Sequence, residues 1–290
     1  IYMHHHHAEE LNFELPNGTI AALAWGPKDA QPILAVHGWL DNAASFIPMA
    51  PYLKDFRLIA IDLLGHGLST HFKTGTYFHF IDYVADIVNI MNLCNWERCA
   101  LLGHSLGAGI SSIVAGIIPE RVSALGLIDG IGPITVNEQQ MPEMMSKSIA
   151  EYAHLPDKKL TRYANQEEAI QARLTASKMA RTSVELLVSR GLRAEHDGFS
   201  WCTDPRLLCK PLAMFTESQI APFLTRISSK TCLLRPSPGW PFDEKIFMAR
   251  INYLQNIEVH RIKGDHHIHM DTPEVVGPLI NEFYTRVLTG

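Results

Sequence analysis

The sequence predicts an α/β fold with a mostly parallel sheet of about eight strands, flanked by helices and interrupted by a helical cap insertion. The first observation is that short apolar runs, each the length of a buried strand, alternate along the chain with segments of helical periodicity. The second is that polar residues and glycines follow these runs, as in His37-Gly38 and Asp129-Gly130. The third is a strand, a sharp turn and a helix within residues 98–109. Strands joined by helices run parallel, and helices then cover both faces of the sheet.

The expected core elements follow in order along the chain. A turn signal at residues 16–19 joins two short strands into a hairpin at the edge of the sheet. We expect strands over residues 11–15, 20–25, 33–36, 58–61, 99–102, 124–128, 231–234 and 258–262. We expect core helices over residues 46–53, 81–91 and 108–119, from about residue 242, and after Pro273.

The pattern changes between about Pro133 and Pro222, where no buried-type strand occurs. Amphipathic helices are expected near residues 138–152, 166–177 and 183–190, and an extended segment near 198–201. The sequence therefore predicts a core in two parts, separated by a helical cap over the strand ends. The predicted boundaries are 8–132 for the first part of the core, 133–222 for the cap and 223–290 for the second part.

The composition of the 290-residue chain is ordinary for a globular enzyme, with 47% hydrophobic and 19% charged residues. A formal net charge of −5 and the lack of a basic cluster argue against a nucleic-acid surface. No apolar run reaches the roughly 18 residues of a membrane span. The five cysteines are odd in number and lack metal-ligand spacing, which favours reduced thiols in a cytoplasmic protein. Residues 1–7, with four consecutive histidines, resemble the remnant of an affinity tag and are excluded from the fold prediction.

Residues 98–109, R-C-A-L-L-G-H-S-L-G-A-G, contain the pattern G-x-S-x-G. It lies between an apolar strand and a helix, which is the context that a nucleophile elbow requires. A Cβ at Gly103 or Gly107 would collide with the neighbouring strand or helix. The turn lifts the Ser105 hydroxyl clear of the sheet and directs the first helix amides, that of Leu106 included, toward the reacting centre. The alternative is a serine at the start of a helix, with glycines that serve packing only.

A serine hydroxyl is a poor nucleophile unless a base takes its proton, so a histidine is expected near Ser105. Four segments together resemble the α/β-hydrolase superfamily and cover most of the chain outside the predicted cap. They are H-G-W at 37–39, D-L-L-G-H-G at 62–67, G-H-S-L-G at 103–107 and G-D-H-H-I-H-M-D-T-P at 264–273. The stretch H-G-W-L-D-N-A-A-S-F, residues 37–46, further resembles the serine hydrolase-like group, which is similar to carboxylesterases in fold and triad.

The resemblance implies that the base follows the last strand, because the superfamily has the chain order serine, acid, histidine. Its members usually show G-H-x-x-H-x-E-x-P there, with the first histidine catalytic. Counting back from Pro273 gives His266, although Asp265 stands where a glycine is usual. His267 is the nearest rival, and His269 is expected to be a structural hydrogen-bonding residue. A metal site on these three histidines is the alternative, but adjacent strand residues point to opposite sides.

Two residues are candidates for the acid that the resemblance implies. Most relatives carry it in the loop after the strand at 231–234, but that loop, R-P-S-P-G-W-P-F-D, has no acid at the expected step. Asp243 comes several residues late, inside the next helix. Asp129 stands at the end of the preceding core strand, where some haloalkane dehalogenases of the same superfamily place the acid. We therefore favour Asp129, whose alternative role is to cap a turn or helix.

The resemblance also implies donors for the oxyanion that forms when a serine attacks a carbonyl group. The amides of Trp39 and Leu106 have the positions that the fold requires. Phe46, His104 and Trp240 are expected to line the substrate pocket. Core packing or a structural role is the alternative for each of these three.

The leading hypothesis is a serine hydrolase that cleaves carboxylic esters of short to medium acyl chains through Ser105, His266 and Asp129. The expected partner is a small-molecule ester, and no cofactor and no metal is expected. One alternative is a carbon–carbon bond hydrolase with the same triad, and another is a non-catalytic ligand-binding protein of the same fold. A haloalkane dehalogenase is excluded because its nucleophile must be a carboxylate. The sequence predicts neither the natural substrate nor the oligomeric state.

Overall fold

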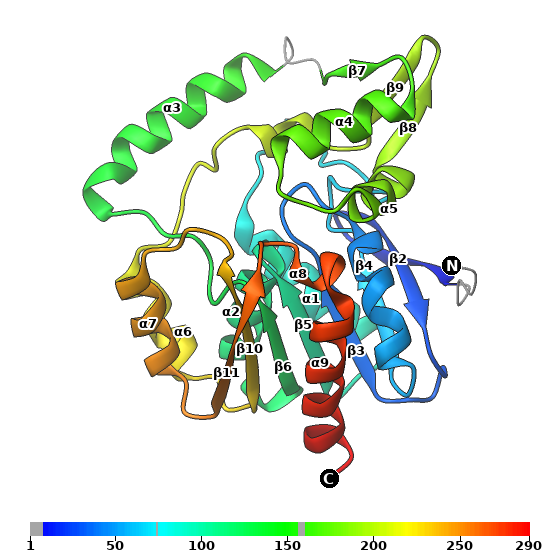
Figure 1. Cartoon of the computed structure of the whole chain (residues 1–290). Coiled ribbons are helices and arrows are strands. Elements are labelled where there is room, and N and C mark those ends of the chain that lie inside the picture. Colours follow the sequence, from blue (N-terminus) through cyan, green and yellow to red (C-terminus); the bar gives the residue numbers. More distant parts are fainter. Residues whose placement is uncertain (1–7, 74, 156–159) are drawn as a thin grey trace.

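The structure is a computed structural model that describes residues 8–73, 75–155 and 160–290. An eight-stranded sheet forms its centre (Figure 1). In spatial order its strands are β1 (Glu9–Leu15), β2 (Gly18–Trp25), β4 (Arg57–Ile61), β3 (Pro32–Val36), β5 (Cys99–His104), β6 (Val122–Ile128), β10 (Thr231–Pro238) and β11 (Ile257–Gly264). The β1–β2 and β2–β4 pairs are antiparallel and the other neighbouring pairs are parallel, which confirms the predicted mostly parallel sheet. The expected tag remnant, residues 1–7, lies outside the described residues.

Helices cover both faces of this sheet. The helical segments of the core are η1 (Ala43–Leu53), α1 (Phe80–Leu93), α2 (Leu106–Ile117), η2 (Pro119–Arg121), α6 (Glu217–Thr225), α7 (Glu244–Tyr253), α8 (Ile268–Asp271) and α9 (Pro273–Leu288). Alternate residues of β3 illustrate how both faces are buried. Two hydrophobic clusters of buried residues lie against the sheet. Leu34 and Val36 pack in the one that contains residues of α1, α2 and α6, whereas Ile33 and Ala35 pack in the one that contains residues of η1 and α9. Continuous burial on both faces explains why the central strands are apolar runs.

Two core elements differ from their sequence-based predictions. The predicted helix over 46–53 is a run of 3-10 turns, η1, because Pro48 and Pro51 each lack the N–H that an α-helix needs. Strand β10 continues four residues past the predicted end at Leu234. Beyond Leu234 it pairs only with β11, since its pairing with β6 ends there. Pro236 and Pro238 are tolerated because the side of β10 that faces β6 forms no further backbone hydrogen bonds with a neighbouring strand there.

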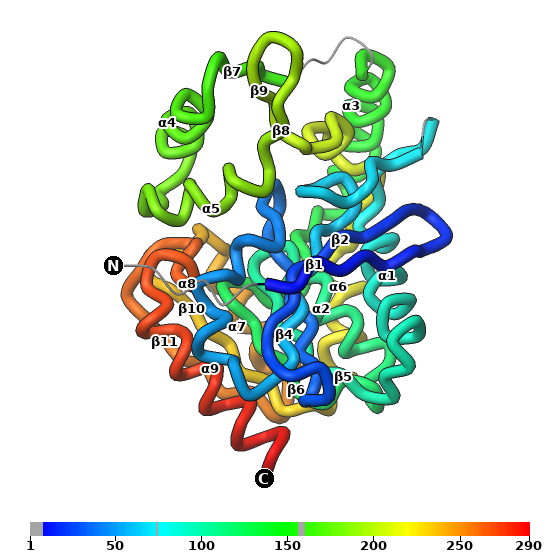
Figure 2. Tube along the Cα trace, turned by 90° about the vertical axis from the view of Figure 1, so that its right-hand side faces the viewer, coloured from blue at the N-terminus to red at the C-terminus, as the bar shows by residue number. Residues whose placement is uncertain are grey.

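Residues 133–222 contain the elements that the sequence predicts for a cap. They are η3 (Glu138–Gln140), α3 (Met141–Ala153), β7 (Arg162–Tyr163), α4 (Gln166–Ala176), α5 (Arg181–Gly191), β8 (Leu192–Glu195), β9 (Gly198–Trp201) and η5 (Pro205–Leu208), followed by the first part of α6. Strands β7, β9 and β8 form a separate three-stranded sheet. Helices α3 and α4 and this small sheet lie on the side of the molecule away from the C-terminus (Figures 1 and 2). The boundary at residue 222 falls inside α6, which packs on α2, so the three-part division stays a prediction.

Within the described ranges, none of the helices has both the length and the apolar character that crossing a membrane demands.

Candidate active site

Ser105 lies at the tip of the turn between β5 and α2, and it is partly exposed. Its backbone has φ 52° and ψ −113°, a conformation that residues with a side chain rarely adopt. A Cβ at Gly103 would lie 2.4 Å from the Gly107 carbonyl oxygen, and a Cβ at Gly107 would lie 1.9 Å from the Val36 carbonyl oxygen. The Ser105 N–H donates to the carbonyl oxygen of Ile128 at 3.0 Å, which ties the turn to the end of β6. The serine is thus held on a strained turn between a strand and a helix.

The imidazole of His266 lies between the hydroxyl of Ser105 and the carboxylate of Asp129. Its Nε2 is 2.9 Å from Ser105 Oγ, and its Nδ1 is 2.6 Å from Asp129 Oδ2. The Asp129 side chain is 1% exposed, and the same oxygen accepts the Trp240 N–H at 2.8 Å. A carboxylate that accepts the Nδ1–H leaves the lone pair of Nε2 directed at the serine hydroxyl. This arrangement lets His266 take the proton of Ser105.

The two candidate acids lie in different surroundings. Asp129 follows β6 and contacts His266, as described above. Asp243 is exposed, and its side chain accepts the N–H groups of Lys245 at 2.9 Å and Ile246 at 3.1 Å. Asp243 therefore caps the N-terminus of α7, where amide donors and the helix dipole stabilise a carboxylate. The structure brings Asp129 to His266 and does not bring Asp243 there.

The predicted oxyanion donors lie at the same edge of the sheet. Leu106 is the first residue of α2, so its N–H has no acceptor within the helix. Trp39 lies in the loop after β3, and Val36 of β3 pairs in parallel with Gly103 of β5. Across the described ranges, no hydrogen bond from either amide to another residue is present. Two such donors beside a nucleophile can stabilise an oxyanion, and their catalytic role stays a prediction.

The three predicted pocket residues divide into one at the site and two behind it. Trp240 is 47% exposed, and its ring centroid lies 5.1 Å from that of His266. Phe46 and His104 have no exposed surface, so they cannot touch a substrate in an open pocket. This corrects the expectation for both: Phe46 packs in the core, and His104 donates from Nε2 to the carbonyl oxygen of His266 at 2.9 Å. The residue types alone did not predict whether the side chains of Phe46 and His104 are exposed, because aromatic rings are common both in cores and in pockets.

The other two histidines of the segment 264–271 are buried behind the site. Nε2 of His267 is 3.0 Å from Oδ2 of Asp41. His269 is fully buried, and neither ring nitrogen has a hydrogen-bond partner among the described residues. The expectation that His269 is a structural hydrogen-bonding residue is therefore wrong. Burial, together with the nearby His267, lowers the pKa of His269 to about 3, so its imidazole is neutral.

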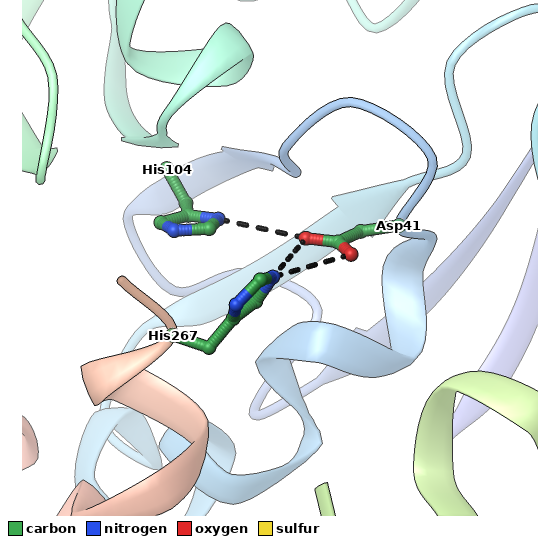
Figure 3. A group of neighbouring side chains, drawn as sticks. All are labelled: Asp41, His104 and His267. Carbon is green, nitrogen blue, oxygen red and sulfur yellow. Dashed lines mark hydrogen bonds and ion pairs between the residues drawn. The ribbon is translucent and has the colours of Figure 1, made fainter. Parts of the chain in front are cut away.

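One group of side chains at this place has ligand atoms close enough for a metal ion. Asp41, His104 and His267 offer ligand atoms that all lie within 4.8 Å of one another (Figure 3). The other oxygen of Asp41 already accepts a hydrogen bond from Nη2 of Arg173 at 2.7 Å. The positive charge of Arg173 opposes a second cation there. The predicted alternative, a site on His266, His267 and His269, does not correspond to this group.

A second such group lies at the edge of the sheet, away from the serine. It consists of Cys232, Glu258 and His260. Burial raises the pKa of the Cys232 thiol to about 12, so the thiol is protonated at neutral pH and is a poor metal ligand. Glu258 accepts a hydrogen bond from Arg286 at 2.7 Å, which compensates its charge.

Residues 31–187, more than half of the chain, match the family model described as the alpha/beta hydrolase fold. The chain belongs to the α/β-hydrolase fold family. This α/β hydrolase is similar to a probable serine hydrolase of Drosophila melanogaster, with 35% identity over 95% of this chain and 87% of the relative.

Two further similarities agree with the family. A serine hydrolase-like protein of Danio rerio is 29% identical over 95% of this chain and 88% of that protein. The crystal structure of a hypothetical protein from Pseudomonas aeruginosa PAO1 superimposes with a TM-score of 0.91 at 34% identity, covering 96% of this chain and 100% of that one. The predicted resemblance to serine hydrolase-like α/β hydrolases is thereby confirmed.

Two residues at the site had no predicted role. Asp41 stands inside the stretch 37–46 that carries the resemblance, in the loop that follows the strand predicted over 33–36, and this position was the available signal. Arg173 lies on α4, 132 residues away from its partner Asp41, and nothing in its surrounding sequence distinguishes it from other helix arginines.

Proposed function

We propose that this α/β hydrolase cleaves carboxylic esters of small molecules, with Ser105 as nucleophile, His266 as base and Asp129 as acid. One observation carries the proposal: the imidazole of His266 lies 2.9 Å from Ser105 Oγ and 2.6 Å from Asp129 Oδ2. A neutral imidazole in this position can accept the hydroxyl proton while the serine attacks a carbonyl carbon. The names of the serine hydrolase-like relatives agree with this chemistry.

In the proposed reaction, Oγ of Ser105 forms a bond to the ester carbonyl carbon, and its proton moves to Nε2 of His266. Asp129 stabilises the imidazolium that results. The amides of Trp39 and Leu106 donate to the carbonyl oxygen as it becomes an anion. The alcohol then leaves with the proton from His266. A water molecule repeats these steps on the acyl-enzyme, which releases the carboxylic acid and restores the serine.

The finer points of the proposal concern the substrate and the compartment. The exposed indole of Trp240 beside His266 supports an apolar group next to the reacting carbonyl, consistent with short to medium acyl chains. Residues 133–222 would serve as a cap that selects the acyl or alcohol group. None of the five cysteines, all within the described ranges, forms a disulfide, which supports a cytoplasmic location.

The test is the hydrolysis of p-nitrophenyl acetate and butyrate by the wild type and by Ser105→Ala. The variant lacks the nucleophile, so we expect kcat/KM to fall by at least about 1,000-fold. Ser189→Ala is the matched control because Ser189 is exposed on α5 and donates only to the Leu186 carbonyl oxygen at 2.7 Å. This control should keep wild-type turnover. Equal turnover in the wild type and in Ser105→Ala would reject the proposal, as would a wild type that hydrolyses neither ester.

A further inference from the structure

Asp41 is a buried carboxylate that the proposed reaction does not use. It lies two residues after Trp39 in the loop that follows β3, and its side chain is 1% exposed. Its N–H donates to the carbonyl oxygen of Gly38 at 3.1 Å, which closes the turn around Trp39. Leu40, inside this turn, has φ 61°, a value that residues with a side chain seldom adopt. A buried charge persists only where partners compensate it, and the partners of Asp41 come from three other segments.

Two of these partners are direct neighbours in sequence of the proposed catalytic residues (Figure 3). His267, which follows His266, places Nε2 3.0 Å from Asp41 Oδ2. His104, which precedes Ser105, places Nδ1 3.7 Å from the same oxygen, which is too far for a hydrogen bond, and burial holds the pKa of His104 well below its ordinary value, so its ring is neutral. The ring of His104 also donates from Nε2 to the carbonyl oxygen of His266 at 2.9 Å. Asp41 is therefore bonded to the histidine loop through His267, and His104 links the elbow to the same loop through its bond to the His266 carbonyl.

The third partner comes from α4, in residues 133–222. Nη2 of Arg173 is 2.7 Å from Oδ1 of Asp41, and the Arg173 side chain is 17% exposed. Burial by itself would raise the pKa of the Asp41 carboxyl, but His267 and Arg173 hold that pKa well below its usual range. Asp41 is thus charged at neutral pH, and an ion pair connects α4 to the catalytic face of the core.

A second buried ion pair joins the same two parts of the molecule but does not reach the catalytic residues. Arg190, on α5, places Nε 2.9 Å from Oδ2 of Asp62. The Asp62 carboxylate also accepts the N–H groups of Ala43 at 2.7 Å and Leu68 at 2.9 Å. None of these residues is a sequence neighbour of a proposed catalytic residue. The Arg190–Asp62 pair is therefore a control: it attaches α5 to the core but does not hold a proposed catalytic residue in place.

We propose that Asp41 is a positioning residue that keeps His266 and the Trp39 amide aligned with Ser105, and that Arg173 holds Asp41 in that position. This inference rests on the proposed ester hydrolysis. Without the guanidinium, the buried carboxylate loses a permanently charged partner, and its bond to His267 is the remaining compensation. The loops that carry His266 and Trp39 then shift. A displacement of about 1 Å at reacting groups costs on the order of 100-fold in rate, and it acts on kcat more than on KM.

The first test compares kcat and KM for p-nitrophenyl acetate in three variants. Arg173→Met keeps an unbranched apolar stem and removes the charge, and we expect kcat to fall about 10- to 100-fold with KM changed less than about threefold. Arg173→Lys restores the charge, and we expect it to recover most of the lost kcat. Arg190→Met removes the reference pair, and we expect it to lower the melting temperature while kcat per folded molecule stays near the wild-type value.

The second test does not depend on turnover. The proton that His266 Nδ1 donates to Asp129 gives a downfield proton resonance in NMR, which can be assigned by its loss in Asp129→Asn. We expect Arg173→Met to shift or broaden this resonance and Arg190→Met to leave it in place. If the two arginine variants behave alike in kcat and in the resonance, Asp41 and Arg173 only anchor residues 133–222, and the inference is overturned. If the wild type lacks Ser105-dependent turnover, the proposed function fails, and the resonance alone decides the positioning role.

Discussion

Helix α2 of the core and helix α3 of residues 133–222 differ sharply in what they bury. Ten of the 12 residues of α2 are buried, against one of the 13 residues of α3. The separate apolar cluster on α4 and α5 contains only Ile170, Val184 and Val188 as buried members. Residues 133–222 contribute Leu207 and Ile220 to the large hydrophobic cluster of the core, and polar contacts also tie them to it, such as Ser183 Oγ donating to Asp271 at 2.6 Å and Arg173 pairing with Asp41.

This difference in burial indicates that the two regions contribute differently to the structure of the site. Apolar burial on both faces of the sheet fixes the strand ends, and these strand ends carry Ser105, Asp129 and His266. Helices α3 and α4 bury few apolar residues, so their attachment depends more on charged and hydrogen-bonded groups. Substitutions in the two regions should therefore have different effects: lost activity or large stability changes in the core, and small stability changes in residues 133–222, except at Arg173, which bonds to Asp41 beside the site.

The largest contrast is expected between two buried aspartates, one from each region. Asp129→Asn puts an amide beside Nδ1 of His266, which favours the wrong imidazole tautomer, so kcat/KM should fall roughly 10³- to 10⁴-fold. Asp204→Asn, in residues 133–222, weakens a carboxylate that accepts from the Arg206 and Phe72 amides at 2.9 and 3.0 Å. It should lower the melting temperature and leave the folded enzyme's kcat/KM within about threefold. Ester hydrolysis and thermal unfolding measure both.

Asp243→Asn is the control for the acid itself. Asp243 caps α7 and does not contact His266, so this variant should lose about 1 kcal/mol of stability and keep its activity. Loss of activity in Asp243→Asn with retention in Asp129→Asn would contradict the assignment of the acid.

A smaller contrast is expected between two isoleucines on helices. Ile110 of α2 is fully buried, and Ile149 of α3 is 52% exposed. Ile110→Ala leaves a cavity in the core and should cost about 2–5 kcal/mol of unfolding free energy. Ile149→Ala should change it by less than about 0.5 kcal/mol. Urea unfolding gives both values, and similar losses in the two variants would mean that α3 is packed in solution more closely than its exposed surface indicates.

The parts of the fold that could be predicted are those that local sequence determines. Strand β5 is buried along all six residues, and its apolar run followed by G-x-S-x-G was sufficient to place it. The position of His266 was implied by the resemblance to the superfamily, through counting within one motif of that family, and the structure places that residue beside Ser105. Pro48 and Pro51 were visible signals against an α-helix over 46–53, so that error could have been avoided.

The rest of the site depends on contacts between distant segments. Asp41 and Arg173 are 132 residues apart, and their pairing follows from the docking of α4, which no local pattern encodes. The aromatic character of Phe46 and His104 is equally compatible with a pocket and with a core, and only packing decides between them. The polar character of His269 suggested a hydrogen-bonding residue, but the fold surrounds it with other rings, including His104 at a centroid distance of 4.3 Å.

The smallest of these contrasts is a pH dependence of the unfolding free energy that comes from His269. Its folded-state pKa of about 3 lies below the roughly 6.5 of an unfolded histidine, so only the unfolded chain takes up a proton between these values. Its contribution to stability is therefore present above pH 6.5 and is lost as the pH falls. At pH 5 the loss is about 2 kcal/mol, that is, about 1.5 pH units at 1.36 kcal/mol each.

The substitution His269→Phe removes the titrating group and keeps a ring against Phe46, whose centroid is 5.5 Å away. Between pH 7 and pH 5, this variant should lose about 2 kcal/mol less unfolding free energy than the wild type in urea titrations. His196, in residues 133–222, is exposed, so His196→Gln should follow the wild type at both pH values. If His269→Phe loses as much stability as the wild type, the acid sensitivity of the core does not come from this buried neutral imidazole, and other core histidines such as His66, whose pKa burial lowers to about 3, become the ones to replace.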